Sequence, residues 1–283
     1  MDIAVRLEEL REKRNALTGT LGLVPTMGYL HDGHLSLVRV AKQQCDHVAA
    51  SIYVNPTQFS PNEDLSNYPR DLERDLQLLE NEGVDLVWTP RDSDMYPDHF
   101  QTWVEVGEIT TLLEGSYRPT HFRGVTTVVA KLFLAVLPDV AVFGQKDAQQ
   151  ALVIQRMVKD LNFPIDIVVA PIVRESDGLA MSSRNTYLNA EQRKAALALS
   201  QSLREVEAAY QAGERDADTL RKRVLAVLND EPLAQPQYVS IADPGTLEEL
   251  HGEVTCALVS MAVYVGKTRL IDNMLLGGER PSA

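Results

Sequence analysis

The run Leu21-Gly22-Leu23-Val24, followed by PTMGYLHDGH at residues 25–34, decides how this chain folds. The apolar run predicts a buried strand. The residues after the polar segment show a helical pattern, with Leu35, Val38 and Ala41 on one face. We therefore expect a strand and a helix that are joined by a polar loop.

That loop has the composition of a phosphate-binding site. Backbone N–H groups at a helix start attract phosphate, and Gly28 and Gly33 would let a ligand approach the backbone closely. His31 and His34 would place two imidazoles beside the phosphates, as donors or as stabilisers of a developing oxyanion. The alternative is a helix capped by Asp32 with two solvated histidines. The H-x-G-H pattern alone gives the two interpretations similar weight.

Strand and helix patterns alternate as far as about residue 175. We expect strands at 20–24, 47–54, 84–89, 140–143 and 166–170, with helices at 33–44, 71–81, 125–136 and 148–161. This alternation predicts an α/β fold with a doubly wound parallel sheet. Ligands bind such sheets at the carboxyl ends of the strands. Residues 1–17, with a stripe at Ile3, Leu7 and Leu10, predict a helix rather than a signal peptide.

The pattern changes after residue 175. Helices are expected at 190–212, 217–229 and 246–250, and strands at 238–242, 255–265 and 268–272. We therefore predict two closely packed domains. Residues 1–175 form the α/β domain, and residues 176–283 form a smaller α+β domain.

Composition limits the compartment and the partners. The net charge of −13, from 40 acidic and 27 basic residues, disfavours nucleic-acid binding. A negative net charge does not exclude a local cluster of cations that binds a nucleotide. Two cysteines form no disulfide framework, and no apolar run approaches the roughly 20 residues that cross a bilayer. We expect a cytoplasmic protein with no membrane partner.

Polar motifs also follow three other predicted strands. NPTQF (residues 55–59) offers Gln58 as an amide donor and acceptor, or is only a turn. FGQKDAQQ (143–150) offers Lys146 as a point charge beside Asp147, which is alternatively a helix cap. Of Gln149 and Gln150, one is expected to face the site and the other solvent.

MSSRN (181–185) offers two hydroxyls and Arg184 for phosphate oxygens, or a serine cap beside a surface arginine. We rank HFRG (121–124) and Lys131 lower as cation sources. Four polar motifs at the ends of strands in one sheet are improbable as separate accidents. Their convergence predicts a nucleotide site.

Taken together, PTMGYLHDGH, NPTQF, YPR (68–70), HFRGV, FGQKDAQQ and MSSRN resemble, in order and separation, the pantoate–β-alanine ligase family. The resemblance spans nearly the whole chain. It implies a Rossmann-like domain of the H-x-G-H nucleotidyltransferase type, with a smaller domain closing over the site, and a homodimer. The implied reaction condenses pantoate with β-alanine, using ATP and Mg²⁺, through a pantoyl adenylate, and releases AMP and pyrophosphate.

The resemblance also implies residue roles. His34, His31 and Lys146 would be catalytic, with His34 as the proton donor, and Gln58 and Gln150 would bind pantoate and β-alanine. No protein ligand is assigned to Mg²⁺. ATP would be bound by Met27, Gly28, Tyr29, Leu30, His31, Asp32, Gly33, His34, Gly144, Gln145, Lys146, Asp147, Val173, Met181, Ser182, Ser183 and Arg184.

Two positions depart from the family pattern. Gln145 stands where the family usually has glutamate, and Ala148 stands where an aromatic residue is common. We expect altered local electrostatics and retained activity, with a less defined pocket edge at Ala148.

Two other functions fit parts of the sequence. A nucleotidyltransferase that stops after transferring AMP or CMP would need extra cations for a phosphorylated substrate, where NPTQF supplies Gln58. A regulatory module would bind ATP without releasing pyrophosphate.

Overall fold

The computed structural model describes residues 1–60 and 63–278 of the 283-residue chain. Its larger sheet has six strands in the order β1-β4-β3-β2-β5-β6, and every neighbouring pair is parallel. The strand order reverses between β2 and β5, which is where ligands bind in such sheets. The strands are β1 (Asp2–Ala4), β2 (Leu21–Thr26), β3 (His47–Ile52), β4 (Leu86–Trp88), β5 (Val140–Gly144) and β6 (Asp166–Ala170). The predicted parallel sheet is confirmed.

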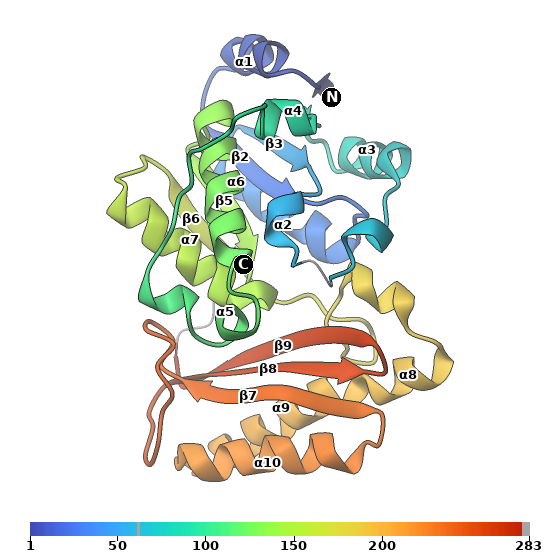
Figure 1. Ribbon diagram of the computed structural model, residues 1–283, viewed down its shortest axis with the longest axis vertical. Coiled ribbons are helices and arrows are strands. Elements are labelled where there is room, and N and C mark those ends of the chain that lie inside the picture. Colours follow the sequence, from blue (N-terminus) through green and yellow to red (C-terminus); the bar gives the residue numbers. More distant parts are fainter. Residues whose placement is uncertain (61–62, 279–283) are drawn as a thin grey trace.

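Helices cover both faces of this sheet (Figure 1). Leu21 and Leu23 of β2 share a core with Phe133, on the face of α1, α6 and α7. Val24 belongs to a separate core with Val38, on the face of α2 and α3. Successive side chains of β2 therefore pack on opposite faces, which explains its continuous apolar run. These helices are α1 (Leu7–Ala16), α2 (Asp32–Gln44), α3 (Leu72–Asn81), α6 (His121–Val136) and α7 (Ala148–Asp160).

The second, smaller domain is built on an antiparallel sheet of β7 (Ala234–Ala242), β8 (Ala257–Val265) and β9 (Thr268–Leu276). The helices α9 (Leu197–Gln211) and α10 (Ala217–Asp230) lie on one face, and α8 (Ala190–Ala195) precedes them. In Figure 1 the other face is turned toward the parallel sheet. Leu203, Leu220 and Val259 belong to its core. The predicted α+β character is confirmed.

The expected N-terminal helix is wrong for the first residues. Residues 2–4 form an edge strand, in which Ile3 pairs with Val87, and α1 begins only at Leu7. The free edge of β4 decides this, because pairing satisfies backbone groups that would otherwise be unpaired. Ile3 is 42% exposed, so its place in the apolar stripe contributes little to the core.

Several other boundaries differ from the predictions. Among them, β7 begins at Ala234 rather than at residue 238, and β9 runs to Leu276 rather than to residue 272. α6 begins at His121, four residues earlier than expected, and residues 190–212 form two helices that meet at Ala196. Residues 246–250 are not helical. Asp243 accepts N–H bonds of 2.8 Å from Gly245 and Thr246 there, and this local turn competes with a helix.

Short elements complete the described chain. They are α4 (Asp92–Met95), α5 (Glu114–Tyr117), and the 3₁₀ helices η1 (Pro56–Gln58), η2 (Leu65–Asn67), η3 (Glu108–Thr110), η4 (Gln145–Asp147) and η5 (Ser183–Tyr187). None of the described helices is long and apolar enough to cross a membrane.

Candidate active site

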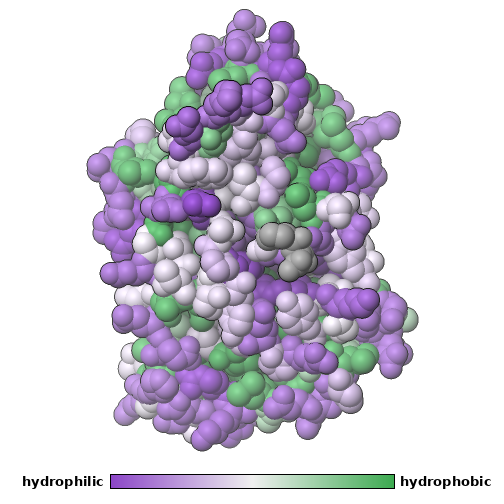
Figure 2. Space-filling view, in the orientation of Figure 1, coloured by the Kyte–Doolittle hydropathy of each residue, from purple (hydrophilic) through white to green (hydrophobic). Residues whose placement is uncertain are grey.

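A cavity opens at the carboxyl ends of the parallel strands. Its walls include Met27 after β2, Asn55 after β3, Gly144 at the end of β5 and Pro171 after β6. A second cavity adjoins it between the two domains, and the two have volumes of about 220 and 430 Å³. Hydrophilic surface predominates where the domains meet (Figure 2). The residues shared by both cavities are Arg118, Lys146, Asp147, Ser182 and Arg184.

The side chains of the two histidines of PTMGYLHDGH accept hydrogen bonds from backbone N–H groups at the start of α2. His31 is the N-cap, and its Nδ1 accepts the N–H of Gly33 at 3.2 Å. Nδ1 of His34 accepts the N–H of His31 at 3.3 Å. Each ring therefore carries its proton on Nε2, which remains available as a donor. The alternative of an Asp32 cap with solvated histidines is wrong.

Both histidines are neutral at physiological pH. Burial, aided by the neighbouring His31 and Lys146, lowers the pKa of His34 to about 3. Burial and Lys146 lower the pKa of His31 to about 4. The pair thus presents N–H donors without positive charge.

A buried carboxylate fixes the loop before these histidines. Asp75 of α3 accepts the N–H of Tyr29 at 2.6 Å and the N–H of Leu30 at 2.7 Å. Gly28 and Tyr29 both have positive φ, 82° and 50°, so the loop needs such support. Sequence reasoning missed Asp75. The available signal was an acidic residue one helical turn from Leu79, on the buried face of a predicted helix.

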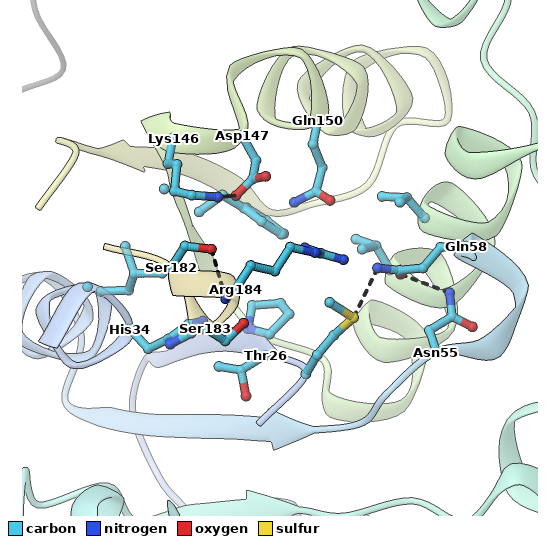
Figure 3. A pocket seen from close by; sticks show the side chains of 18 of the residues that line it. Thr26, His34, Asn55, Gln58, Lys146, Asp147, Gln150, Ser182, Ser183 and Arg184 are labelled. Atoms are coloured by element: carbon cyan, nitrogen blue, oxygen red, sulfur yellow. Dashed lines mark hydrogen bonds and ion pairs between the residues drawn. The ribbon is translucent and has the colours of Figure 1, made fainter. Parts of the chain in front are cut away.

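Lys146 and Asp147 lie together at the end of β5. Their charged atoms are 3.7 Å apart. Asp147 occupies the N-cap position of α7, but its side chain makes no capping hydrogen bond. Its carboxylate is therefore directed to the cavity, as Figure 3 shows, rather than used as a cap.

Gln145 faces the second domain. Its Nε2 donates to Oδ1 of Asn273 at 3.1 Å, while Nδ2 of Asn273 donates to the carbonyls of Gln145 and Lys146, both at 2.9 Å. Gln145 does not line the cavity at the carboxyl ends of the parallel strands. The departure from the family pattern at this position is thus part of the contact between β9 and η4.

The loop after β6 brings hydroxyls and an arginine to the cavity. Ser182 Oγ accepts the N–H of Arg184 at 3.3 Å, so it caps η5 while lining the site. Ser183 Oγ lies 3.2 Å from the hydroxyl of Tyr68. Arg184 is not a solvated surface arginine, because its side chain is only 28% exposed and donates two hydrogen bonds to Asp64. Burial opposes its charge, yet Asp64 outweighs burial and raises the pKa of Arg184.

Gln58 lies at the opposite end of the cavity (Figure 3). Its Oε1 accepts from Nδ2 of Asn55 at 3.0 Å, and its Nε2 lies 3.1 Å from the sulfur of Met27. Nδ1 of His121 lies 2.8 Å from the Gln58 carbonyl oxygen. Burial lowers the pKa of His121 to about 4, with Arg118 contributing. The motif HFRG therefore supports the Gln58 loop.

Of the two glutamines of α7, one faces the site as expected, but the other does not face solvent. Gln150 lines the same cavity as Gln58. Gln149 is buried rather than solvated. It accepts the N–H of Glu114 at 2.9 Å and donates to the carbonyls of Ile109 and Leu112 at 2.8 Å each.

The wall between Gln58 and Gln150 is apolar. It is formed by one face of α6 together with aromatic side chains from β5 and the end of β3. These residues are Tyr53, Val125, Val128, Val129, Leu132 and Phe143. Such a pocket excludes water from a reacting group.

Most residues predicted for the site line this one cavity. They are Met27, His31, Gly33, His34, Gln58, Gly144, Lys146, Asp147, Gln150, Val173, Met181, Ser182, Ser183 and Arg184. Gly28, Tyr29, Leu30, Asp32 and Gln145 lie outside its lining. Sequence reasoning did not assign Asn55, Tyr68, Arg118 and His121, which line it as well.

The fold and the site define the class of protein. A parallel sheet, an H-x-G-H loop at its switch point and cations beside an apolar pocket are the features of an α/β nucleotide-binding enzyme. The family model for pantoate-β-alanine ligase matches residues 2–275. The chain belongs to this family.

Relatives agree over almost the full length. The pantothenate synthetase of Thermoanaerobacter sp. (strain X514) is 60% identical over 280 residues, covering 98% of this chain and 99% of the relative. That of Roseiflexus sp. (strain RS-1) is 59% identical over 276 residues, covering 98% and 99%.

Solved structures give the same result. Pantothenate synthetase from Thermus thermophilus superposes with a TM-score of 0.93 at 46% identity, covering 97% of this chain and 99% of that one. The Francisella tularensis pantoate-β-alanine ligase, complexed with β-γ ATP and β-alanine, gives 0.82 at 36% identity and covers both chains fully.

Proposed function

We propose that this chain condenses pantoate with β-alanine through a pantoyl adenylate, using ATP and releasing AMP and pyrophosphate. One observation carries the proposal beside family membership. A single cavity joins a phosphate-binding end at His34, Lys146 and Arg184 to an apolar pocket between Gln58 and Gln150. That is the arrangement needed to bring a carboxylate beside an α-phosphate.

In the first step, a pantoate carboxylate oxygen bonds to the α-phosphorus and the bond to the β-phosphate oxygen breaks. Lys146 and Arg184 stabilise the negative charge that moves onto pyrophosphate. His31 and His34 donate Nε2–H hydrogen bonds. Burial lowers the pKa of His34 to about 3, so its imidazole is neutral before ATP binds, and we propose that it acts on the phosphates as a hydrogen-bond donor.

In the second step, the amine of β-alanine bonds to the pantoyl carbonyl carbon and its proton passes to solvent. The bond from that carbon to the phosphate oxygen breaks, and AMP leaves. The side-chain amides of Gln58 and Gln150 orient the substrates. The apolar wall formed by α6 protects the adenylate from water. Catalysis then rests on positioning and electrostatics, with no covalent enzyme intermediate.

Mg²⁺ fits this chemistry as a metal held mainly by ATP. No group of three or more potential ligands occurs among the described residues. Mg²⁺ bound to nucleotides commonly uses one or two carboxylates plus phosphate oxygens and water. Asp147, whose carboxylate is 46% exposed and faces the cavity, would hold it. The metal would add charge stabilisation at the phosphates.

We also propose that residues 1–175 form the substrate-binding domain, with residues 176–283 closing over it. Cavities lined from both sides support this division, although residues 279–283 lie outside the described part.

A homodimer is proposed from exposed apolar side chains at the adjoining ends of α6 and α7, namely Leu134, Leu137 and Leu161. A cytoplasmic location fits the two free cysteines.

Label transfer tests the chemistry. With pantoate carrying a labelled carboxylate oxygen, complete turnover should deliver the label to AMP and form the amide. Without β-alanine, pyrophosphate should appear in a burst close to one per active site. ADP with labelled inorganic phosphate would overturn the adenylate mechanism, and ATP binding without pyrophosphate release would indicate a regulatory module.

A further inference from the structure

The segment of residues 63–68 packs against the phosphate-binding loop at residues 182–187. Asp64 pairs with Arg184, and the hydroxyl of Tyr68 lies 3.2 Å from Ser183 Oγ. The hydroxyl of Tyr187 donates to the carbonyl of Asn67 at 3.2 Å. A segment far away in sequence therefore contacts the very side chains that are arranged for phosphate.

The central contact uses two parallel hydrogen bonds. Nε of Arg184 donates to Oδ2 of Asp64 at 3.1 Å, and Nη2 donates to Oδ1 at 3.0 Å. Carboxylate and phosphate both bind a guanidinium in this forked manner. Asp64 thus occupies one edge of Arg184 as a phosphate would.

The charge of Asp64 acts against an anionic ligand in any pose. If a phosphate takes the edge held by Asp64, the carboxylate must leave. If it takes another edge of Arg184, the carboxylate still lies beside the phosphate and repels it. Both side chains are about one-quarter exposed, at 24% for Asp64 and 28% for Arg184, so water screens this repulsion only in part.

We propose that Asp64 is a positioning residue that substitutes for phosphate at Arg184, lowering the affinity for ATP and for the pyrophosphate that leaves. The carboxylate keeps Arg184 in place before ATP binds. It competes again for Arg184 after the α–β bond of ATP has broken, which favours pyrophosphate release. The inference rests on the proposed use of this site for ATP.

The neighbouring acid provides a matched control. Glu63 makes the same kind of forked contact with a different arginine, through bonds of 2.7 and 2.6 Å from Arg118. Arg118 also donates to the Gln58 carbonyl at 3.3 Å, toward the apolar end of the cavity. Glu63→Gln therefore removes one negative charge from the same segment without freeing Arg184.

The test measures binding of ATP with Mg²⁺, and of tripolyphosphate alone, by calorimetry on the full chain. Asp64→Asn keeps an acceptor for Arg184 but removes the charge. We expect it to tighten both ligands by about three- to tenfold. Glu63→Gln should change either affinity by less than about twofold. In an Arg184→Ala background, Asp64→Asn should give no gain. Steady-state inhibition by pyrophosphate should strengthen in Asp64→Asn by the same factor as binding.

Unchanged or weaker binding by Asp64→Asn would overturn the proposal, as would an equal gain from Glu63→Gln or a gain that persists without Arg184. Circular dichroism checks that each variant is folded. Asp64→Ser also removes the charge, and it replaces Asp64→Asn if that variant does not fold. Binding is measured without pantoate or β-alanine. A chain that binds ATP but forms no amide would therefore contradict the proposed function and leave this result standing.

Discussion

At the scale of single residues, the phosphate end of the cavity combines neutral and charged donors. His31 and His34 contribute N–H groups whose orientation is fixed by backbone hydrogen bonds. Lys146 and Arg184 contribute charge from two different loops. The division is physical, because a buried imidazole loses its proton more readily than an ammonium or guanidinium group does.

Lys146→Ala should lose activity mainly in adenylation. A charge-assisted phosphate contact is worth about 1.5–3 kcal/mol, so pyrophosphate release should slow by about 10- to 150-fold. The melting temperature should change little, because the ion pair of this side chain is a 3.7 Å contact with its partly exposed neighbour Asp147. Near-normal pyrophosphate release from a folded variant would remove Lys146 from the mechanism.

Acid should destabilise the fold through three histidines, of which His121 is buried and His31 and His34 are half-buried. The pKa values of His31, His34 and His121 fall from 6.5 to about 4, 3 and 4. The unfolded chain binds these protons first, so the unfolding free energy falls as pH drops below 6.5 and levels off below the folded pKa values. Each histidine should cost about 1.6 kcal/mol between pH 6.5 and 5.

Denaturant unfolding at several pH values measures this slope. His34→Gln should reduce the pH dependence of the unfolding free energy by roughly the contribution of one histidine. His99→Asn provides the control, at an exposed position with φ of 65° that asparagine tolerates. An identical slope in His34→Gln and the unaltered chain would contradict the assignment.

At the scale of elements, α6 and η1 approach so closely that only glycine fits between them. A Cβ on Gly124 would lie 2.5 Å from the Thr57 carbonyl oxygen and 2.7 Å from the Gln58 nitrogen. Nδ2 of Asn55 also donates to the Gly124 carbonyl at 3.1 Å. The position of Gln58 is therefore set by a helix that lies far along the chain.

Gly124→Ala should displace η1 and weaken pantoate use more than ATP use. Overpacking at such a contact costs about 1–3 kcal/mol of unfolding free energy. The KM for pantoate should rise several-fold, while the affinity for ATP stays near its original value. Gly245→Ala is the control, since a Cβ at this exposed position would meet only Oδ1 of Asp243, at 3.4 Å, which is an ordinary contact. Equal losses for both substrates would indicate general loosening instead.

At the scale of the whole molecule, the two sheets meet through polar contacts. Asn273 of β9 bonds to η4, and Arg269 forms a forked pair with Glu114 at 2.7 and 2.8 Å. Arg174 pairs with the buried Asp272 at 2.6 Å. Directional contacts of this kind join the two domains, and among them Asn273 bonds directly to the backbone of the Lys146 loop.

Asn273→Ala should misplace the Lys146 loop. It leaves the carbonyls of Gln145 and Lys146 without partners, at about 1–3 kcal/mol for each buried group that stays unpaired. We expect a several-fold slower pyrophosphate release and a raised KM for ATP. Asn229→Ala, at an exposed position of α10, is the control. Unchanged kinetics in folded Asn273→Ala would show that the loop holds itself in place.

Local signals recovered most of the fold because they are physically local. Strands buried on both faces are apolar throughout, as β2 is, and amphipathic helices repeat every 3.6 residues. The errors fall where contacts with another part of the chain determine the local secondary structure. β1 forms because β4 has a free edge, and residues 246–250 turn because Asp243 bonds their backbone.

The sequence by itself determined the parallel sheet, the second domain and the loops that carry His34, Gln58, Lys146 and Arg184, since each motif follows its own strand. Tertiary structure alone decided what those side chains contact. Asp75 supports the histidine loop from 45 residues away, Asn273 holds the Lys146 loop, and Asp64 pairs with Arg184 across 120 residues. Asn273 and Asp64 leave no local trace, and Asp75 leaves only an acidic residue on the buried face of a helix, because hydrogen bonding and charge depend on distance in space and not on separation along the chain.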